Sequence, residues 1–400
     1  MNMIIKKIIL IFSLLLFIFK LFFPINDPVV IEDKISKLFI IGNIENMNSK
    51  DDERVVSISY LSDDISFMKF AKIKIQGASS SFYDKKNYTI KLYNDISLGD
   101  KYKVDFGWGK ENKYVLKANW IDKTHTRNIV SSRISSSVSK KYNLYEESPN
   151  YGNIDGFPVE VYINGEFLGL YTLNIPKDAW LLGMEEENSN HLIFEAQINN
   201  DMTFFKKEAQ YGAWTLEVGA ENNTNLNKLN RLYNFINNST DEEFKNEFSN
   251  YFNLDSVLNY YVLTDVLFLC DNLGKNLLLV SYDGNIWYTL LYDLDTSFGM
   301  NSYGNDLYLY DNSILFYKSN LFLRFGNLFK DEIRDRYLEL RKDILTVDNI
   351  YKEIDEFYSL IPSSTFDKES KRWGDIPGYD IEQMKDFINK RLIYLDGVYS

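Results

Sequence analysis

The sequence predicts an α+β fold, with strands in the first part of the chain and mainly helices in the second. Apolar and polar residues alternate in the first part, as in Val55–Tyr60, which is typical of half-buried strands. From Leu226 onwards, apolar residues recur at helical spacing. Hydrophobic residues make up 45% of the chain, enough for a large core. We therefore expect a β-rich N-terminal lobe at residues 27–222 and a mainly helical C-terminal lobe at residues 223–400.

Residues 1–24 are expected to form a signal peptide or a membrane anchor. Lys6 and Lys7 precede an apolar run from Ile8 to Phe19, the pattern of an export signal. Because lysines before such a run stay in the cytoplasm, the rest of the chain should lie outside it. The sequence thus predicts an extracytoplasmic protein that is either membrane-anchored or secreted. A cytosolic protein with an apolar N-terminal helix is the alternative.

Two turns that connect predicted strands of the N-terminal lobe can be recognised in the sequence. Gly77 and the loop Ser79–Ser81 precede the strand Tyr88–Tyr93. Small residues let backbone N–H groups approach a phosphate, so this loop is a candidate phosphate cradle, and an ordinary hairpin is the alternative. A second hairpin, over residues 157–173, turns at Asn164-Gly165, the pair typical of a type I′ turn.

A helix is predicted at Thr124–Val138, after a strand at Lys113–Ala118. Asp122 is expected to cap this helix, because its carboxylate can accept the free backbone N–H groups of the first turn. Arg127 lies at the start of the same helix. Its guanidinium can bind a phosphate through two hydrogen bonds, so Arg127 is a candidate nucleotide ligand.

Four polar side chains of the C-terminal lobe are expected to meet at one place. A helix that we expect to be capped at Asp255 runs towards the first of them, and a hairpin that turns tightly at Asp283-Gly284 follows. Helix, Asp-x-x-x-x-Asn, hairpin and Asp occur in this order in protein kinases, where they supply the base and the magnesium ligands. Alternatively, these polar residues only mark the end of a helix and the end of a strand, and no ligand binds there. The four residues are Asp271, Asn276, Asp293 and Asp295.

Charge and the scarcity of cysteine and histidine exclude several other functions. The net charge of −13 argues against general binding to nucleic acid, although lysines cluster at residues 72–91 and 101–117. The single cysteine, Cys270, permits no internal disulfide and is either a nucleophile or a buried, inert thiol. His125 and His191 are the only imidazoles, so a zinc site or a Ser-His-Asp triad is not expected.

Several blocks of the sequence resemble, in order, those of the spore coat protein H (CotH) kinase family. Four positions depart from the family pattern: Gln76 replaces an arginine, Ala78 an asparagine and Tyr292 a tryptophan, and no glutamate follows Tyr171, where the chain reads Asn174-Ile-Pro-Lys177. The similar blocks are Lys74–Ser81, Lys85–Lys91, Ala118–Asn128, Val159–Tyr171, Asp271–Asn276, Tyr292–Gly299 and the last helix, Phe387–Tyr394.

The resemblance implies a two-lobed, atypical protein-kinase-like fold that transfers the γ-phosphoryl group of ATP to a Ser or Thr hydroxyl of a protein. It assigns the catalytic base to Asp271. The nucleotide ligands would be Lys91, with Lys86 as the alternative, and Arg127. Glu195 and Glu217 are candidates for the carboxylate that pairs with the nucleotide-binding lysine. The magnesium ligands would be Asn276, Asp293 and Asp295.

Two other classes of function remain open at this point. An exported structural or binding protein could keep the fold without catalysis, because ATP is scarce outside the cytosol. A glycoside hydrolase that uses two carboxylates is also compatible with the aromatic-rich composition. The acceptor protein and the oligomeric state do not follow from the sequence.

We predict that the full-length protein fractionates with membranes, because Ile8–Phe19 is apolar and preceded by lysines. A variant that begins at Asp27 should instead be soluble. Fractionation of cells that express each form, followed by immunoblotting, measures the difference. Recovery of the full-length protein entirely in the cytosolic fraction would refute this expectation.

Overall fold

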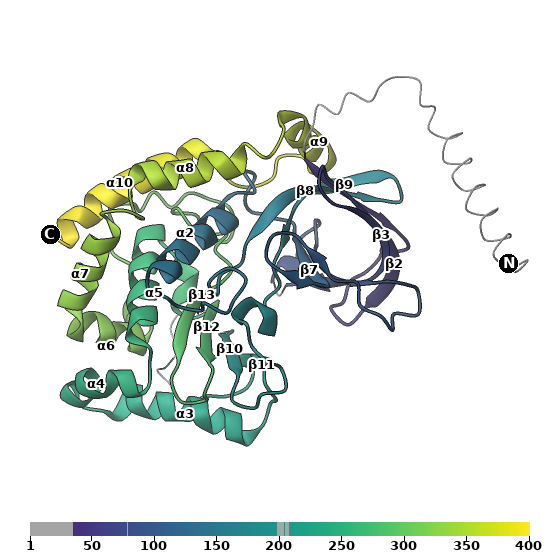
Figure 1. The fold of residues 1–400 in the computed structure, drawn as a ribbon. Coiled ribbons are helices and arrows are strands. Elements are labelled where there is room, and N and C mark those ends of the chain that lie inside the picture. Colours follow the sequence, from purple (N-terminus) through teal and green to yellow (C-terminus); the bar gives the residue numbers. More distant parts are fainter. Residues whose placement is uncertain (1–34, 78, 198–203, 205–207, 315) are drawn as a thin grey trace, which may run out of the picture. The chain divides into compact units, whose positions relative to one another are not determined.

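The first part of the chain forms a β-barrel in the computed structural model, which describes residues 35–77, 79–197, 204, 208–314 and 316–400. The barrel strands follow the order β1-β2-β3-β4-β7-β9-β8, and the parallel pairing of β1 with β8 closes the ring (Figure 1). The predicted signal peptide or anchor at residues 1–24 lies outside the described residues. Among the helices of the described residues, none is long and apolar enough to cross a membrane. The barrel strands are β1 (Ser36–Ile41), β2 (Glu53–Leu61), β3 (Ser66–Gln76), β4 (Asn87–Tyr93), β7 (Lys113–Lys117), β8 (Gly156–Ile163) and β9 (Glu166–Asn174), and β5 (Val104–Asp105) pairs with β6 (Lys110–Glu111) beside them.

Alternation along each strand separates the barrel interior from its outer face. On β3, Ala71, Ile73 and Ile75 are buried in the barrel core, whereas Lys72 and Lys74 face outwards. The hairpin β8–β9 turns at Asn164-Gly165 as predicted, and both residues have positive φ. Lys72 and Lys74 therefore lie on the outer face of a closed, apolar barrel.

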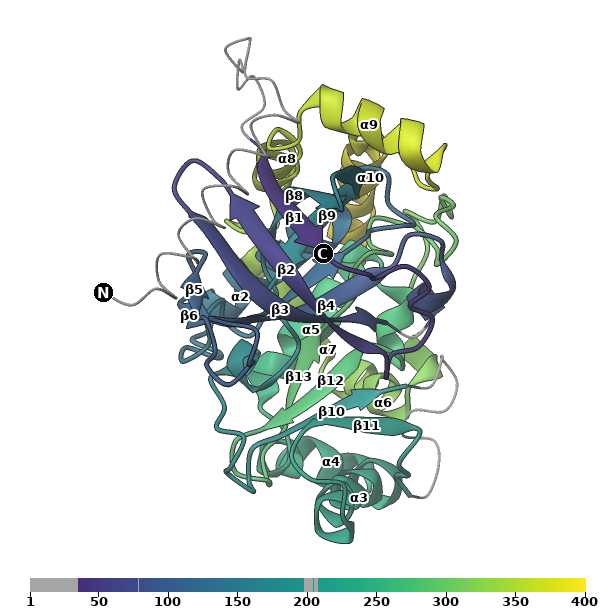
Figure 2. The same cartoon turned by 90° about the vertical axis from the view of Figure 1, so that its right-hand side faces the viewer.

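A second sheet, of order β11-β10-β12-β13, leads into the helical part of the chain (Figure 2). Its strands are β10 (Leu192–Ala196), β11 (Trp214–Val218), β12 (Leu277–Ser281) and β13 (Tyr288–Leu291). This sheet crosses the predicted lobe boundary at residue 222, because β10 pairs with β12. The boundary itself remains a prediction.

Most helices surround the second sheet and share one apolar core with it, whereas the helix Ser363–Trp373 packs on β9 of the barrel. The predicted α+β class, with a β-rich N-terminal region and a helical C-terminal region, is confirmed. The helices are α2 (Arg127–Lys141), α3 (Asn223–Asn238), α4 (Asp241–Glu247), α5 (Leu254–Leu267), α6 (Asn320–Leu328), α7 (Lys330–Leu340), α8 (Val347–Tyr358), α9 (Ser363–Trp373) and α10 (Ile381–Val398), with short 3-10 turns η1 (Ser79–Phe82), η2 (Ala179–Leu182), η3 (Phe248–Asn250), η4 (Cys270–Leu273) and η5 (Phe316–Lys318).

Two local expectations were wrong. The hairpin β12–β13 does not turn tightly at Asp283-Gly284, because only Gly284 has a positive φ and the Asp283 carboxylate accepts N–H groups of a wider loop. Helix α5 is capped by Asn253, whose side chain accepts the N–H of Ser256, and not by Asp255. Both errors arose where several turn-forming residues are adjacent, so that composition does not select one of them.

Helix α9 attaches the end of the chain to the barrel through a buried ion pair (Figure 1). Glu369 lies 2.5 Å from the ammonium of Lys85, and it also accepts the N–H of Leu170 on β9 at 2.7 Å. Lys85 donates a further hydrogen bond to the carbonyl of Ala118. Burial lowers the pKa of Lys85 to about 8, although the carboxylate of Glu369 opposes that shift. The carboxylate of Glu369 thus offsets the positive charge of a lysine side chain that has no access to water.

We predict that Glu369→Gln lowers the free energy of unfolding by about 3 kcal/mol near neutral pH, because it leaves a buried ammonium without its carboxylate. The loss should shrink as the pH rises. In the folded variant the pKa of Lys85 lies below its unfolded value, so the unfolded state binds more protons across that interval and stability increases with pH. Urea denaturation at about pH 7 and about pH 9 measures both effects.

Glu382→Gln provides the control, because Glu382 is 75% exposed and 3.7 Å from Lys385. Loss of such an exposed pair should cost less than about 0.5 kcal/mol. Equal losses in the two variants would show that the Lys85–Glu369 pair contributes no more than a surface contact.

Candidate functional site

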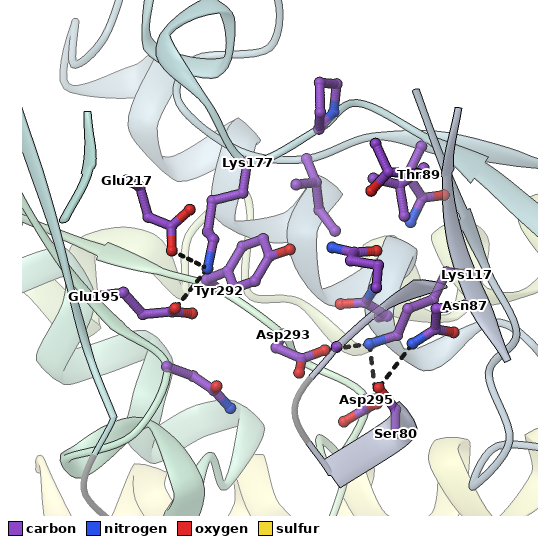
Figure 3. Close-up of a pocket in the computed structure, with 18 of the residues that line it drawn as sticks. Ser80, Asn87, Thr89, Lys117, Lys177, Glu195, Glu217, Tyr292, Asp293 and Asp295 are labelled. Atoms are coloured by element: carbon purple, nitrogen blue, oxygen red, sulfur yellow. Dashed lines mark hydrogen bonds and ion pairs between the residues drawn. The ribbon is translucent and has the colours of Figure 1, made fainter. Parts of the chain in front are cut away.

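A cavity of about 440 Å³ separates the barrel from the second sheet and the loops at its ends. Strands β3, β4, β7 and β9 present their outer faces to it. Strands β10 and β11, the η4 turn and the segment after β13 supply the opposite wall. Figure 3 shows that charged side chains from both walls point into this space. The cavity therefore lies where segments far apart in the sequence meet.

The turn that carries Asp271 is held by its neighbour Asn272. Helix α5 ends at Leu267, and Phe268 adopts a left-handed conformation that turns the chain into η4. The buried side chain of Asn272 donates to the carbonyl of Tyr292 at 2.8 Å, and the hydroxyl of Tyr260 donates to the carbonyl of Asn272. Asp271 and the residue that follows Tyr292, Asp293, are thus fixed relative to one another.

Asn276 and Asp293 both have backbone conformations that most residues avoid. Their φ angles are +64° and +55°, in the left-handed region that Asn and Asp tolerate best. The N–H of Asn276 donates to Ala196 of β10. After Asp293, the N–H of Leu294 donates to the side chain of Asn128 on α2 at 2.9 Å. Such positions cluster at functional sites, where the surrounding structure maintains the strain.

Lys117, at the end of β7, contacts both carboxylates of the Asp-x-Asp pair. Its ammonium donates to Asp293 and lies 3.4 Å from Asp295. Burial opposes ionisation of Asp293, but Lys117 holds the pKa of that carboxyl below its usual value. Burial, followed by the charge of Asp293, raises the pKa of Asp295 to about 7. One ammonium is thus shared between two carboxylates that repel each other.

The donor atoms beside this pair fit a magnesium ion. Asn276, Asp293 and Asp295 all line the cavity and offer amide and carboxylate oxygens, which magnesium prefers. The buried hydroxyl of Thr296, next in the chain, has no hydrogen-bond partner among the described residues. No cluster of three or more His, Cys, Asp or Glu suited to a metal occurs in the described chain. Any metal here would therefore depend on the amide as well as the two carboxylates.

The cavity is rich in lysine although the protein is acidic overall. Seven lysines and five carboxylates line it, in a chain whose net charge is −13. Lys113, Lys117 and Lys177 have carboxylate partners. Among the described residues, the other four have no ion-pair partner, which suits a polyanionic ligand. These four are Lys50, Lys74, Lys91 and Lys275.

The loop predicted to cradle phosphate lies at the edge of this cavity. Gly77 has a φ of +104°, and a Cβ there would lie 1.9 Å from the hydroxyl of Ser80, so the position requires glycine. Asn87 donates to that hydroxyl at 3.0 Å and accepts the N–H of Ala118 at 2.6 Å. The loop is thereby joined to the strand end that carries Lys117.

The three predicted nucleotide ligands occupy different positions. Lys91 lines the cavity, whereas Lys86 does not and donates to carbonyls of the adjoining turn, at Ser81 and Tyr83. Arg127 is fully buried away from the cavity wall. It donates to the carbonyl of Ser297 at 3.0 Å, so in this structure it supports the segment that follows Asp295. The N-cap of its helix is Thr126 and not, as was predicted, Asp122, although the carboxylate of Asp122 accepts the N–H groups of Thr126 and Arg127.

Two lysines of the site were missed in the sequence. Lys117 shares the outward face of β7 with Lys113, and this even spacing was the available signal. Glu195 and Glu217 do pair with a lysine, but that lysine is Lys177, at 2.6 and 3.2 Å. Lys177 lies in the stretch where the sequence departs from the family pattern.

Cys270 is partly exposed and does not line the cavity. Burial, with the negative charge of Asp271, raises the pKa of its thiol to about 11. A thiol with such a pKa is protonated near neutral pH and is a poor nucleophile. The chemistry of the cavity therefore belongs to its carboxylates, amides and lysines.

A family model described as CotH kinase protein matches residues 73–395. A search of curated proteins finds no match to this chain.

Proposed function

The chain belongs to the CotH kinase family, and on that basis we propose that it is a protein kinase that transfers the γ-phosphoryl group of ATP to a Ser or Thr hydroxyl of another protein. One observation carries this proposal. A single cavity collects Asp271, Asn276, Asp293 and Asp295 together with four lysines that lack ion-pair partners among the described residues. A base, oxygen ligands for a metal and free cations for phosphate are the groups that phosphoryl transfer needs.

We interpret the architecture as a two-lobed, atypical protein-kinase-like fold. In this interpretation the barrel is the first lobe, and the second sheet with its helices is the second lobe. The cavity between them, with lysines on the barrel side and Asp271 on the other, supports this view.

We assign the role of general base to Asp271. Its carboxylate would take the proton of the acceptor hydroxyl while that oxygen bonds to the γ-phosphorus and the bond to the β-phosphate oxygen breaks, releasing ADP. Burial raises the pKa of Asp271, an effect that Lys275 opposes and Asp293 reinforces. Because the base must be ionised, the rate should fall with decreasing pH at a higher pH than an ordinary aspartate would give.

Asn276, Asp293 and Asp295 would hold the magnesium ion. Such an ion would supply positive charge that offsets the charge of the phosphate groups. Lys117 is the best-placed lysine to pair with phosphate, since it already lies against Asp293 at the cavity wall, and Lys91 is the next candidate. Asn272 and Asn128 would keep the two carboxylate segments in position.

We further propose that the enzyme acts outside the cytoplasm, on a protein that remains to be identified. This part of the proposal depends on the apolar segment at residues 8–19.

A non-catalytic binding protein is the second candidate, and one contact favours it. The ammonium of Lys117 lies between the two carboxylates that would hold the metal, so it already compensates their charge. If that ammonium does not yield to magnesium, the cavity could bind anions without catalysis. The two experiments below distinguish these possibilities.

We expect Asp293→Ala to abolish the magnesium-dependent stabilisation by ATP without unfolding the protein. A ligand that binds only the native state raises the melting temperature, so thermal-shift titration with ATP and magnesium measures this effect. Asp155→Ala is the control, since Asp155 pairs with Arg133 at 2.8 Å but does not line the cavity. If ATP with magnesium stabilises the Asp293→Ala variant as much as the wild type, the metal must bind at another site.

Asp271→Asn should still bind ATP with magnesium but transfer phosphate at least about a hundredfold more slowly. The substitution keeps the shape of the side chain and removes the proton acceptor, whose contribution is typically of this size. Incorporation of radiolabelled phosphate into the protein itself or into candidate acceptors measures the rate. Equal incorporation by wild type and variant would exclude Asp271 as the base, and binding of ATP without any incorporation would favour the non-catalytic protein.

A further inference from the structure

The cavity contains a second lysine shared by two carboxylates, on the side opposite Lys117 (Figure 3). The ammonium of Lys177 lies 2.6 Å from Glu195 and 3.2 Å from Glu217. It also lies over the ring of Tyr292, 4.7 Å from the ring centroid. The side chain of Gln197 donates to Glu195 at 2.6 Å. All of these groups line the cavity.

Strand order separates this group from two of the unpaired lysines, Lys74 and Lys91, along the barrel wall of the cavity. Lys74 lies on β3 and Lys91 on β4, whereas Lys177 follows the end of β9. Neighbouring strands lie about 4.8 Å apart, so the three steps from β3 to β9 span roughly 14 Å. That span can accommodate an extended nucleotide, with one end on the lysines and the other near the glutamates.

The charges of the two ends determine which part of a nucleotide each can accept. Lys50, Lys74 and Lys91 have no ion-pair partner in the described chain, and they suit a triphosphate. At the other end two carboxylates share one ammonium. Unlike Asp293 and Asp295, they are assigned no magnesium ion that would offset the surplus negative charge, so this charge repels phosphate. Ionised carboxylates accept hydrogen bonds but donate none. Their ligand must therefore present O–H or N–H donors.

We propose that the end of the cavity formed by Glu195 and Glu217 binds the nucleoside part of the nucleotide, with the carboxylates accepting hydrogen bonds from ribose hydroxyls or from an amino group of the base. This proposal rests on the proposed function and adds the orientation of the nucleotide. Val115 and Pro176 supply apolar surface between the two ends. Lys177 acts as a positioning residue, because its ammonium holds both carboxylates together.

Wild-type protein provides the first test. Titration calorimetry with magnesium would compare ATP, 2′,3′-dideoxy-ATP, purine riboside triphosphate and inorganic tripolyphosphate. Loss of a hydrogen bond to a charged acceptor should weaken binding about tenfold or more. We expect ATP to bind more tightly than tripolyphosphate and than at least one analogue. The dideoxy compound reports on the ribose, and purine riboside triphosphate, which lacks the amino group, reports on the base.

Glu217→Ala provides the second test. The proposal predicts that this substitution affects the affinities for ATP and for tripolyphosphate differently. Glu217 is 27% exposed, so its removal should not unfold the protein. ATP should bind about tenfold more weakly, whereas tripolyphosphate should bind as well as before or better, because a negative charge has been removed. The control is Glu332→Ala, whose carboxylate is 35% exposed and lies 3.3 Å from Lys245, away from the cavity. It should change neither affinity.

Three results would overturn the proposal. These are equal affinities of wild type for ATP and tripolyphosphate, an undiminished affinity of Glu217→Ala for ATP, or a parallel loss of both ligands in that variant. In each case ATP still binds wild type, so the proposed kinase function stands and only the orientation fails. Absence of binding of any nucleotide to wild type would instead refute both proposals.

Discussion

A lysine shared by two partly buried carboxylates joins the barrel to the second sheet, and the candidate site depends on this contact. Lys117 ends β7, and Asp293 and Asp295 follow β13. Burying such charges is costly unless they are paired, so the two walls of the cavity cannot separate without exposing or isolating them. Lys177 makes a similar connection from the end of β9 to β10 and β11. Electrostatic attraction thus aligns the parts whose apolar cores are separate.

Neutral hydrogen bonds provide the precision that ion pairs lack. Asn272 connects the Asp271 turn to the end of β13, and Asn128 connects α2 to the residue after Asp293. Amide side chains suit this task because they have directional donors and acceptors and carry no charge that would compete with the site. Arg127 is charged, but it likewise supports the site from behind, through the carbonyl of Ser297. Residues that resemble ligands in the sequence can therefore serve as supports behind the ligands.

Local signals explain most of what the sequence predicted correctly. The Asn164-Gly165 hairpin and the helix before Asp271 follow from neighbouring residues, and the expectation that Asp271, Asn276, Asp293 and Asp295 meet rests on order along the chain. Partners separated by long stretches could not be predicted in this way. Lys117 reaches Asp293 across 176 residues, and Glu369 reaches Lys85 across 284. Such contacts depend on the closed barrel and on helix packing, which no local pattern encodes.

The distance in sequence between Lys85 and Glu369 also affects the order in which the protein can be completed. Strand β1 needs β8 to close the barrel, and the lysine beneath β9 needs helix α9, which is synthesised nearly 200 residues after β9. A chain that emerges from its N-terminus, at a ribosome or through a membrane, therefore has an early β-region that lacks one of its internal charges until nearly the whole polypeptide is available. Contacts of such long range also slow folding, because the loops they close are costly in entropy. The barrel region is synthesised early, but its buried lysine is paired only after a much later helix has been made.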